Sequence, residues 1–77
     1  MSLLKDFMES RIDCKFQSQQ EKDEFYKIMQ EWGFDCRDVM SDNSDRVYCL
    51  NIYKKVENDI IPGYICHTYK EIFKEEY

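Results

Sequence analysis

One segment of the chain carries complete signals for where a helix begins and where it ends. Ser18 and Glu21 form a capping box, in which both side chains satisfy free backbone N–H groups of the first turn. Gly33 follows as the residue that ends the helix in a left-handed conformation. The apolar residues between these signals recur at helical spacing and share one face: Phe25, Ile28, Met29 and Trp32. The sequence therefore predicts an amphipathic helix from Gln19 to about Trp32.

Three other segments have strand character. Residues 11–17 alternate with period two, which places apolar side chains on one side of a strand and polar ones on the other. The inward set is Ile12, Cys14 and Phe16, and the outward set is Asp13, Lys15 and Gln17. Residues 46–55 predict a second strand, and a turn at 56–59 leads to a third strand over 60–68. Pro62-Gly63 interrupts this last strand, which indicates a bulge or an edge position because proline donates no ladder hydrogen bond.

The remaining segments complete the expected fold. Residues 1–10 carry a short apolar stripe and predict an N-terminal helix or arm. Residues 35–45 are rich in Asp and Ser and are expected to be mostly loop, with one short strand near their start. Thr68 and Glu71 form a second capping box, which begins a short C-terminal helix. We therefore expect a single α+β domain, residues 1–77, with a three-stranded, mostly antiparallel sheet covered by one main amphipathic helix and flanked by short N- and C-terminal helices.

Composition excludes several classes of function. Sixteen acidic and eleven basic side chains give a formal net charge of -5, which argues against direct binding of nucleic acid. No stretch resembles a secretory signal or a membrane span, so we expect a cytoplasmic protein without membrane contact. In that reducing compartment the cysteines are interpreted as small apolar side chains, and their spacing fits no structural zinc site. They are Cys14, Cys36, Cys49 and Cys66.

A catalytic site has little support in the sequence. His67 is the only histidine, and no nucleophile elbow, phosphate-binding glycine loop or paired-carboxylate motif accompanies it. An ordinary polar residue on a strand accounts for it. The acids of residues 35–45 also lack the alternation, the central glycine and the closing glutamate of a calcium loop. We therefore expect a protein that is not an enzyme and that holds no metal or cofactor.

Four aspartates in this acidic stretch support a sharper hypothesis. Asp35, Asp38, Asp42 and Asp45 are spaced by three, four and three residues, so a helix would gather them into one acidic stripe. In a loop they still form a local cluster of carboxylates, which suits a groove built for phosphates. The alternative is that an acidic surface serves solubility alone, because a net charge of -5 is ordinary for a small soluble domain.

Aromatic residues supply candidate anchors for such a surface. Six tyrosines are many for so small an interior. The aromatics expected in the core are Phe16, Phe25, Trp32, Tyr48 and Tyr53. Those expected to be partly exposed, as at many interfaces, are Tyr26, Tyr64, Tyr69 and Tyr77. The partner-binding residues predicted from charge and aromatic character are Asp35, Asp38, Asp42, Asp45, Tyr26 and Tyr64.

The order of these elements resembles that of many small acidic proteins of bacteriophages and mobile elements. A strand precedes Ser-Gln-Gln-Glu-Lys-Asp-Glu-Phe, a helix closes on Glu31-Trp32-Gly33-Phe34, and strands follow, so the resemblance covers about residues 12–73. That class includes inhibitors of host defence enzymes, anti-CRISPR proteins among them. The resemblance implies a location in the cytoplasm of a bacterial host cell, and it carries over no catalytic residues.

Our leading hypothesis is a non-enzymatic inhibitor that binds a larger host protein and blocks a basic, nucleic-acid-handling surface, such as that of a CRISPR effector. The alternative is a structural accessory subunit or a homodimer, formed by pairing of an exposed strand edge at Ile60–Thr68. Salt separates the two hypotheses, because exposed charge pairs are screened beyond about 8 Å at physiological ionic strength whereas strand pairing resists salt. An enzymatic function would need a pocket around Cys66 and His67.

Overall fold

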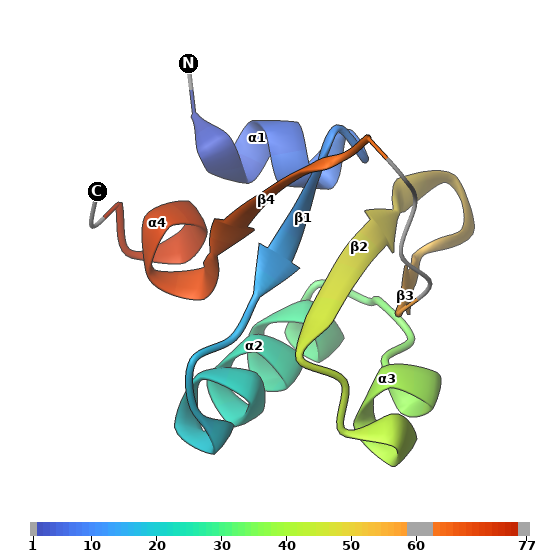
Figure 1. Ribbon diagram of the computed structural model, residues 1–77. Coiled ribbons are helices and arrows are strands. Elements are labelled where there is room, and N and C mark those ends of the chain that lie inside the picture. The colour runs from blue at the N-terminus through green and yellow to red at the C-terminus, as the bar shows by residue number, and fades with distance from the viewer. Residues whose placement is uncertain (1, 59–62, 76–77) are drawn as a thin grey trace.

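The computed structural model describes residues 2–58 and 63–75 of the chain. A short helix and a strand precede the main helix, another short helix leads into a β-hairpin, and the last strand continues directly into the last helix (Figure 1). The helices are α1 (Leu3–Met8), α2 (Gln19–Glu31), α3 (Arg37–Asp42), the 3-10 helix η1 (Asn51–Tyr53) and α4 (Tyr69–Phe73). The strands are β1 (Ile12–Lys15), β2 (Arg46–Leu50), β3 (Lys55–Glu57) and β4 (Ile65–Thr68).

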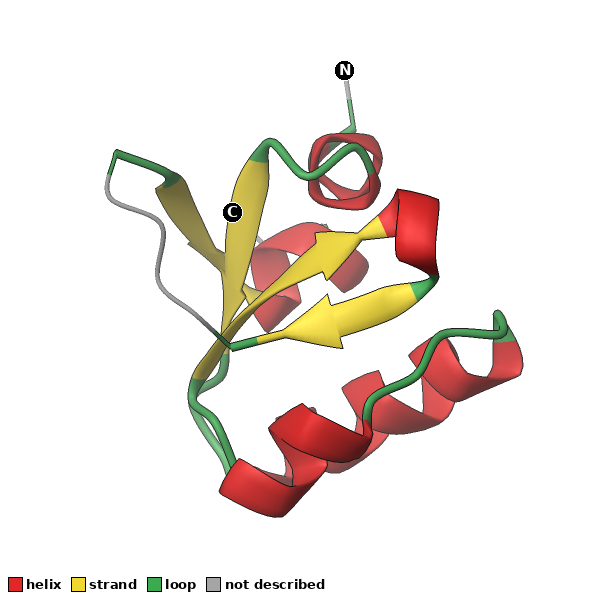
Figure 2. Cartoon of the chain, turned by 90° about the vertical axis from the view of Figure 1, so that its right-hand side faces the viewer, coloured by secondary structure: helices red, strands yellow, loops and turns green. Residues whose placement is uncertain are grey.

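The described strands form one sheet in the order β3-β2-β1-β4. β2 pairs antiparallel with both β1 and β3, whereas β1 and β4 run parallel. The predicted α+β class is confirmed. The prediction of three strands is wrong, because the described sheet has four; the sheet is mostly antiparallel as predicted, and the β1–β4 pair makes it mixed. Both views place α1 near one end of the strands and α2 with α3 near the other (Figures 1 and 2).

The extra strand arises because the expected strand over 46–55 folds back on itself. Lys54 has a φ of 51°, a left-handed conformation, and its backbone N–H bonds to the carbonyl of Asn51 at 3.2 Å. The chain reverses there, and β3 pairs back onto β2 with Cys49 opposite Val56. Residues 56–57, predicted to be a turn, are therefore strand. No glycine marks this reversal, which is why the sequence pattern does not reveal it.

The parallel pair follows from where β3 and β4 lie. They are the two edge strands of the sheet, so β4 pairs with β1 on the side away from the hairpin, with Cys14 opposite His67. The predicted edge position of the last strand is confirmed. The described strand begins at Ile65, and the part of the prediction that falls on residues 60–62, with the bulge at Pro62, lies outside the described residues.

Both ends of α2 follow the sequence signals. The Ser18 hydroxyl accepts the backbone N–H of Glu21 at 3.2 Å, and the Glu21 carboxylate accepts the N–H of Gln17 at 3.0 Å, one residue before the expected donor. Gly33 has a φ of 87°, and the N–H of Phe34 bonds back to the carbonyl of Met29 at 2.9 Å. These bonds satisfy groups that a helix end leaves free.

The core lies between the sheet and the helices and is rich in aromatic rings. Phe25 of α2 meets Phe16 at 5.0 Å and Phe7 of α1 at 5.9 Å between ring centroids. The apolar face expected for α2 is confirmed at its centre and wrong at its end, because Trp32 is 46% exposed where the helix stops. Further buried side chains come from every strand except β4 and from α3 and α4: Cys14, Val39, Val47, Cys49, Val56, Tyr69 and Ile72.

Candidate protein-binding surface

The acidic stretch folds into a helix, and this corrects the prediction that it is mostly loop. α3 begins at Arg37 without a side-chain cap and ends at Asn43, which is left-handed with a φ of 51°. Buried Val39 holds the helix to the core, so packing supplies what the sequence lacks in capping signals. The short strand expected near Cys36 is reduced to a single parallel bridge between Asp35 and Lys55.

The four predicted carboxylates border this helix, and we call them the α3 rim: Asp35, Asp38, Asp42 and Asp45. Asp38 and Asp42 lie one turn apart on α3, while Asp35 precedes the helix and Asp45 follows it. Of the expected acidic stripe on one helix, only the two middle residues, Asp38 and Asp42, lie on α3. Each member of the α3 rim also has a partner within the chain, which the sequence pattern did not indicate.

Asp35 is held by the helix that it precedes. Its carboxylate accepts the Arg37 backbone N–H at 3.0 Å and two guanidinium N–H groups, from Nε at 3.0 Å and Nη2 at 2.9 Å. These hydrogen bonds lower the pKa of Asp35 from 3.8 to about 2. The carboxylate therefore stays ionised throughout the physiological range of pH.

Lys55 joins the middle of the α3 rim to the edge strand β3. Its ammonium lies 3.1 Å from the Asp38 carboxylate and 2.9 Å from that of Glu57. Hydrogen bonds to these carboxylates raise the pKa of Lys55, and the bond to Glu57 contributes most. The backbone also closes this edge, because the Asp35 N–H bonds to the Lys54 carbonyl at 2.9 Å. An edge strand covered in this way is protected from pairing with another chain.

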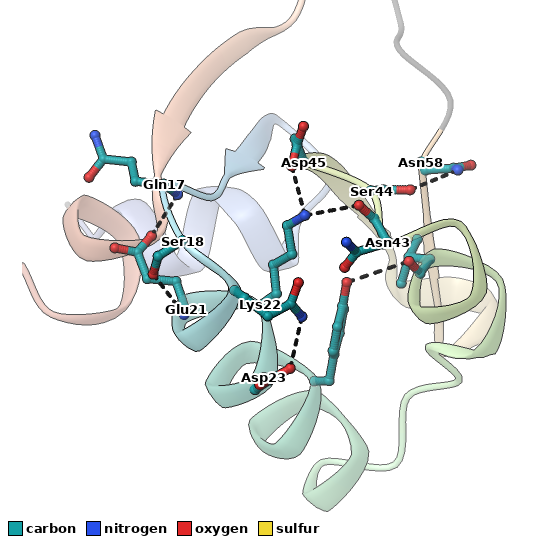
Figure 3. Close-up of polar contacts among 12 residues, drawn as sticks. Gln17, Ser18, Glu21, Lys22, Asp23, Asn43, Ser44, Asp45 and Asn58 are labelled. Carbon is teal, nitrogen blue, oxygen red and sulfur yellow. Dashed lines mark hydrogen bonds and ion pairs between the residues drawn. The ribbon is translucent and has the colours of Figure 1, made fainter.

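The end of the α3 rim is tied to Lys22 of α2, as Figure 3 shows, and to Asn58, which follows β3. The buried Lys22 ammonium lies 2.7 Å from the Asp45 carboxylate and donates to the Asn43 carbonyl at 2.9 Å. Asn58 donates to the Asp42 carboxylate at 2.7 Å. Lys22 therefore satisfies a carbonyl at the end of α3 while its charge is balanced by Asp45, whose side chain is 82% exposed.

The two predicted tyrosine anchors do not join this surface as expected. Tyr26 is buried, and its hydroxyl donates to the Val39 carbonyl at 3.4 Å, so the prediction of an exposed anchor is wrong. Tyr64 is half-buried beside β4, and its carbonyl accepts from the Arg46 guanidinium at 3.3 Å. Tyr69 is buried rather than exposed, and Tyr77 lies outside the described residues.

Sequence reasoning missed an ion pair in the sheet. Asp13 was expected to face water because it alternates with apolar neighbours, but it is 1% exposed. Its Oδ2 atom lies 2.7 Å from both Nε and Nη2 of Arg46 on the neighbouring strand. Its Oδ1 atom is buried without a hydrogen-bond partner among the described residues. The signal that would have found the pair is the register of β1 and β2, which no local pattern contains.

The sequence also missed an apolar projection at the hairpin. Ile52 is 91% and Tyr53 75% exposed, although Tyr53 was expected in the core. Both belong to η1, where the chain turns from β2 to β3. Exposed apolar side chains that neighbour each other are typical of interaction sites.

The side chains capable of metal binding or acid–base chemistry are dispersed. Within residues 2–58 and 63–75, no cluster of three His, Cys, Asp or Glu side chains could hold a metal ion. His67 is half-buried, with Nδ1 3.6 Å from the Glu71 carboxylate. Burial raises the pKa of the Cys36 and Cys49 thiols to about 11, and it also raises that of Cys66. The four cysteines are unpaired thiols, and three of them are buried, whereas Cys66 is half-buried.

Comparison of the chain with family models, with curated proteins and with solved structures finds no match. In the part of the chain that the structure describes, the helices are too short or too polar to cross a membrane. The candidate surface therefore rests on the geometry of the α3 rim and of the projection at η1.

Proposed function

We propose that this chain is a non-enzymatic inhibitor that binds a larger nucleic-acid-handling protein and occupies its basic surface with the α3 rim. The observation that carries the proposal is the pair Asp38 and Asp42, one turn apart on an exposed helix and flanked by Asp35 and Asp45. The class of partner, a host protein such as a CRISPR effector, follows from the resemblance to small phage proteins.

The internal partners of the α3 rim leave it available to a second protein. The Asp38 side chain is 60% exposed and that of Asp45 more so. Exposed ion pairs contribute little to stability, because water and salt screen them and long side chains lose freedom in forming them. An arginine of the partner, which binds a carboxylate with two parallel hydrogen bonds, can replace such a contact at little cost to the fold.

The spacing of the carboxylates also supports mimicry of a phosphate backbone. Four residues of helix rise by about 6 Å, which is the axial distance between Asp38 and Asp42. Phosphates follow one another at about 3.4 Å per step along the axis of one DNA strand. The carboxylates need not match the phosphate positions one by one, because a cationic groove recognises charge rather than base sequence.

The test is capture of a partner from nuclease-treated bacterial lysate, followed by competition. A basic partner of the α3 rim should be released by raised salt and displaced by a short DNA duplex. The variant Asp38→Asn/Asp42→Asn should weaken the captured complex at least about tenfold, since charge-assisted hydrogen bonds exceed the 1.4 kcal/mol that a tenfold change requires.

The matched control is Asp23→Asn/Glu31→Gln, which removes the same charge from the exposed side of α2. It should leave the complex unchanged, because the proposal concerns position and not net charge. Equal binding by both double variants, or a complex that DNA does not displace, would contradict the proposal. Asp45 is left unchanged in this test because it balances the buried Lys22.

A second candidate, a structural homodimer formed by strand pairing, is favoured by one observation. β4 is an edge strand whose first residue, Ile65, is 63% exposed. At the other edge of the sheet, the backbone of Asp35 forms a bridge with β3. Among the described residues, no segment forms such a bridge with the edge of β4 that faces away from β1. Such a dimer would resist salt, and a proline in place of Cys66 would disrupt it, since proline removes a backbone donor from the strand.

A further inference from the structure

We infer that two copies of this chain associate through the apolar projection at η1, which we call the η1 tip and define as Asn51–Tyr53. The tip is held in place at both ends. It continues β2 directly, and left-handed Lys54 closes it, with the Lys54 ammonium bonded to the Asn51 side chain at 2.9 Å. Ile52 and Tyr53 therefore project from a defined turn and cannot fold back into the core without breaking the hairpin.

A groove lies beside the η1 tip. It has a volume of about 420 Å³ and lies between the tip, Leu50 and the segment that ends α1, formed by Met8, Glu9 and Ser10. The Ser10 hydroxyl donates to the Cys49 carbonyl, which ties that segment to β2. The groove is in the size range of pockets that enclose ligands, about 300–1,000 Å³. The groove and the two projecting side chains therefore leave apolar atoms in contact with water.

The projection and the groove are adjacent, so the surface is complementary to itself. In a two-fold dimer the same patch on both copies forms the contact, and residue i of one copy meets residue j of the other in both directions. A second copy turned by 180° can place its Ile52 in the groove while its own groove receives Ile52 of the first. The exposed side chain and the empty volume are then both explained by one contact.

Charge permits a second copy at the η1 tip, whereas it opposes one at the acidic surfaces of the chain. The chain carries a net charge of -5, so two copies repel at the α3 rim. Among the described residues that line the groove, only Glu9 is charged, and its carboxylate lies 3.6 Å from the Arg11 guanidinium. The patch is therefore close to neutral. No residue of the α3 rim lines the groove, although the rim begins close to the tip, where the Asp35 N–H bonds to the Lys54 carbonyl.

The area available sets the expected strength. A stable interface covers about 800 Å² of each partner, which is roughly a sixth of the 4903 Å² that this chain exposes. The η1 tip and the groove comprise seven residues, against roughly 20–30 on each side of a stable interface, so we expect a dimer that dissociates in about the micromolar range. Apolar contact should make it insensitive to moderate salt.

Sedimentation equilibrium of the full chain, from about 5 to about 500 μM, tests the inference in the range where small interfaces dissociate. The wild type should pass from monomer to dimer over this range, and Ile52→Asp should raise the dissociation constant at least tenfold. Ile65→Asp on β4 is the matched control, because it places the same charge at another exposed isoleucine. It should dimerise like the wild type, and circular dichroism should show all three proteins folded.

Three results would overturn the inference. A wild type that remains monomeric at every concentration excludes the dimer, and a dimer lost in Ile65→Asp but kept in Ile52→Asp assigns it to the β4 edge. A monomer that binds an apolar dye through Ile52 assigns the groove to an apolar ligand. None of these results bears on the α3 rim, so the proposed inhibitor function stands or falls separately.

Discussion

Asp13 and Asp38 both pair with a basic side chain from a neighbouring strand, yet they have opposite surroundings. Asp13 is buried in the sheet, where Arg46 approaches it with two nitrogens at 2.7 Å. Asp38 lies on the surface of α3, where Lys55 is shared with Glu57. Both pairs join an aspartate carboxylate to a cation, a guanidinium in the first and an ammonium in the second, and they differ most in burial.

Burial decides whether an ion pair holds the fold or remains free for recognition. A carboxylate removed from water loses its hydration, and only a close partner with good geometry compensates for that loss. A carboxylate at the surface keeps its hydration, so its partner adds little and is easily exchanged. Asp13 therefore belongs to the structure of the sheet, whereas the exposed acids of the α3 rim keep the hydration and the loose pairing that the proposed function requires.

The largest expected effect comes from removing the partner of the buried acid. Arg46→Met should lower the free energy of unfolding by about 3–5 kcal/mol, the range found when one member of a buried pair is lost. That is a large fraction of the total stability of a domain of this size, roughly 4–12 kcal/mol. Urea denaturation measures the loss.

Two further variants sharpen this prediction. The double variant Asp13→Leu/Arg46→Met should regain most of the stability, because an apolar pair has no charge to desolvate. Arg37→Met, the same change at the exposed partner of Asp35, should have little effect. If Arg46→Met and Arg37→Met were equally stable, burial would not distinguish the two pairs.

An intermediate effect is expected at Lys22, which combines a buried amine with an exposed acid. Lys22→Met should lower the free energy of unfolding by about 1–3 kcal/mol, because it leaves the Asn43 carbonyl at the end of α3 without its donor. Lys27→Met is the control, since Lys27 is exposed on the same helix. Hydrogen exchange should show α3 opening more often in the Lys22 variant and unchanged in the control.

The smallest effect is the pH dependence of the exposed pair at Asp35. The pKa of Asp35 is lowered from 3.8 to about 2, so the folded state favours the ionised carboxylate. The stabilisation from this group is thus present above about pH 4 and is lost as the pH falls toward 2. A carboxyl titration followed by NMR should give a midpoint near 2, and Arg37→Met should return it toward 3.8. A midpoint that does not move would show that Arg37 is not the cause.

The elements that the sequence predicted well are those with local signals at both ends. α2 begins at the Ser18 cap and ends before Gly33, within one residue of the expected bounds. The capping box of Thr68 and Glu71 is complete and begins α4. Such signals act between residues three or four positions apart, so they are written in the sequence itself.

The elements that the sequence predicted poorly depend on residues far apart in the chain. α3 lacks a capping side chain and is held by Val39 in the core and by Lys22 from α2. The strand over 46–55 was expected to be continuous because Lys54 gives no warning of a left-handed turn. In both places the surrounding structure overrides a weak local preference.

The candidate site divides in the same way. The sequence identified the four acids of the α3 rim from spacing alone, but not their partners, because Lys22, Lys55 and Asn58 come from other elements. It placed Tyr26 at the surface, whereas packing against α3 buries this side chain. The exposure of Ile52 and Tyr53 could not be predicted either, since apolar residues in a strand-like run are ordinarily expected to be buried.

The sequence by itself determined the helices that carry their own caps, the α+β class and the position of the acidic charge. The tertiary structure alone decided the parallel pairing of β1 and β4, the burial of Asp13 beside Arg46 and the exposure of the η1 tip. Capping and periodicity are interactions within one or two helical turns, and they act in any context. Strand order, burial and the choice of ion-pair partner depend on which distant segments meet, and that is settled only when the whole chain packs.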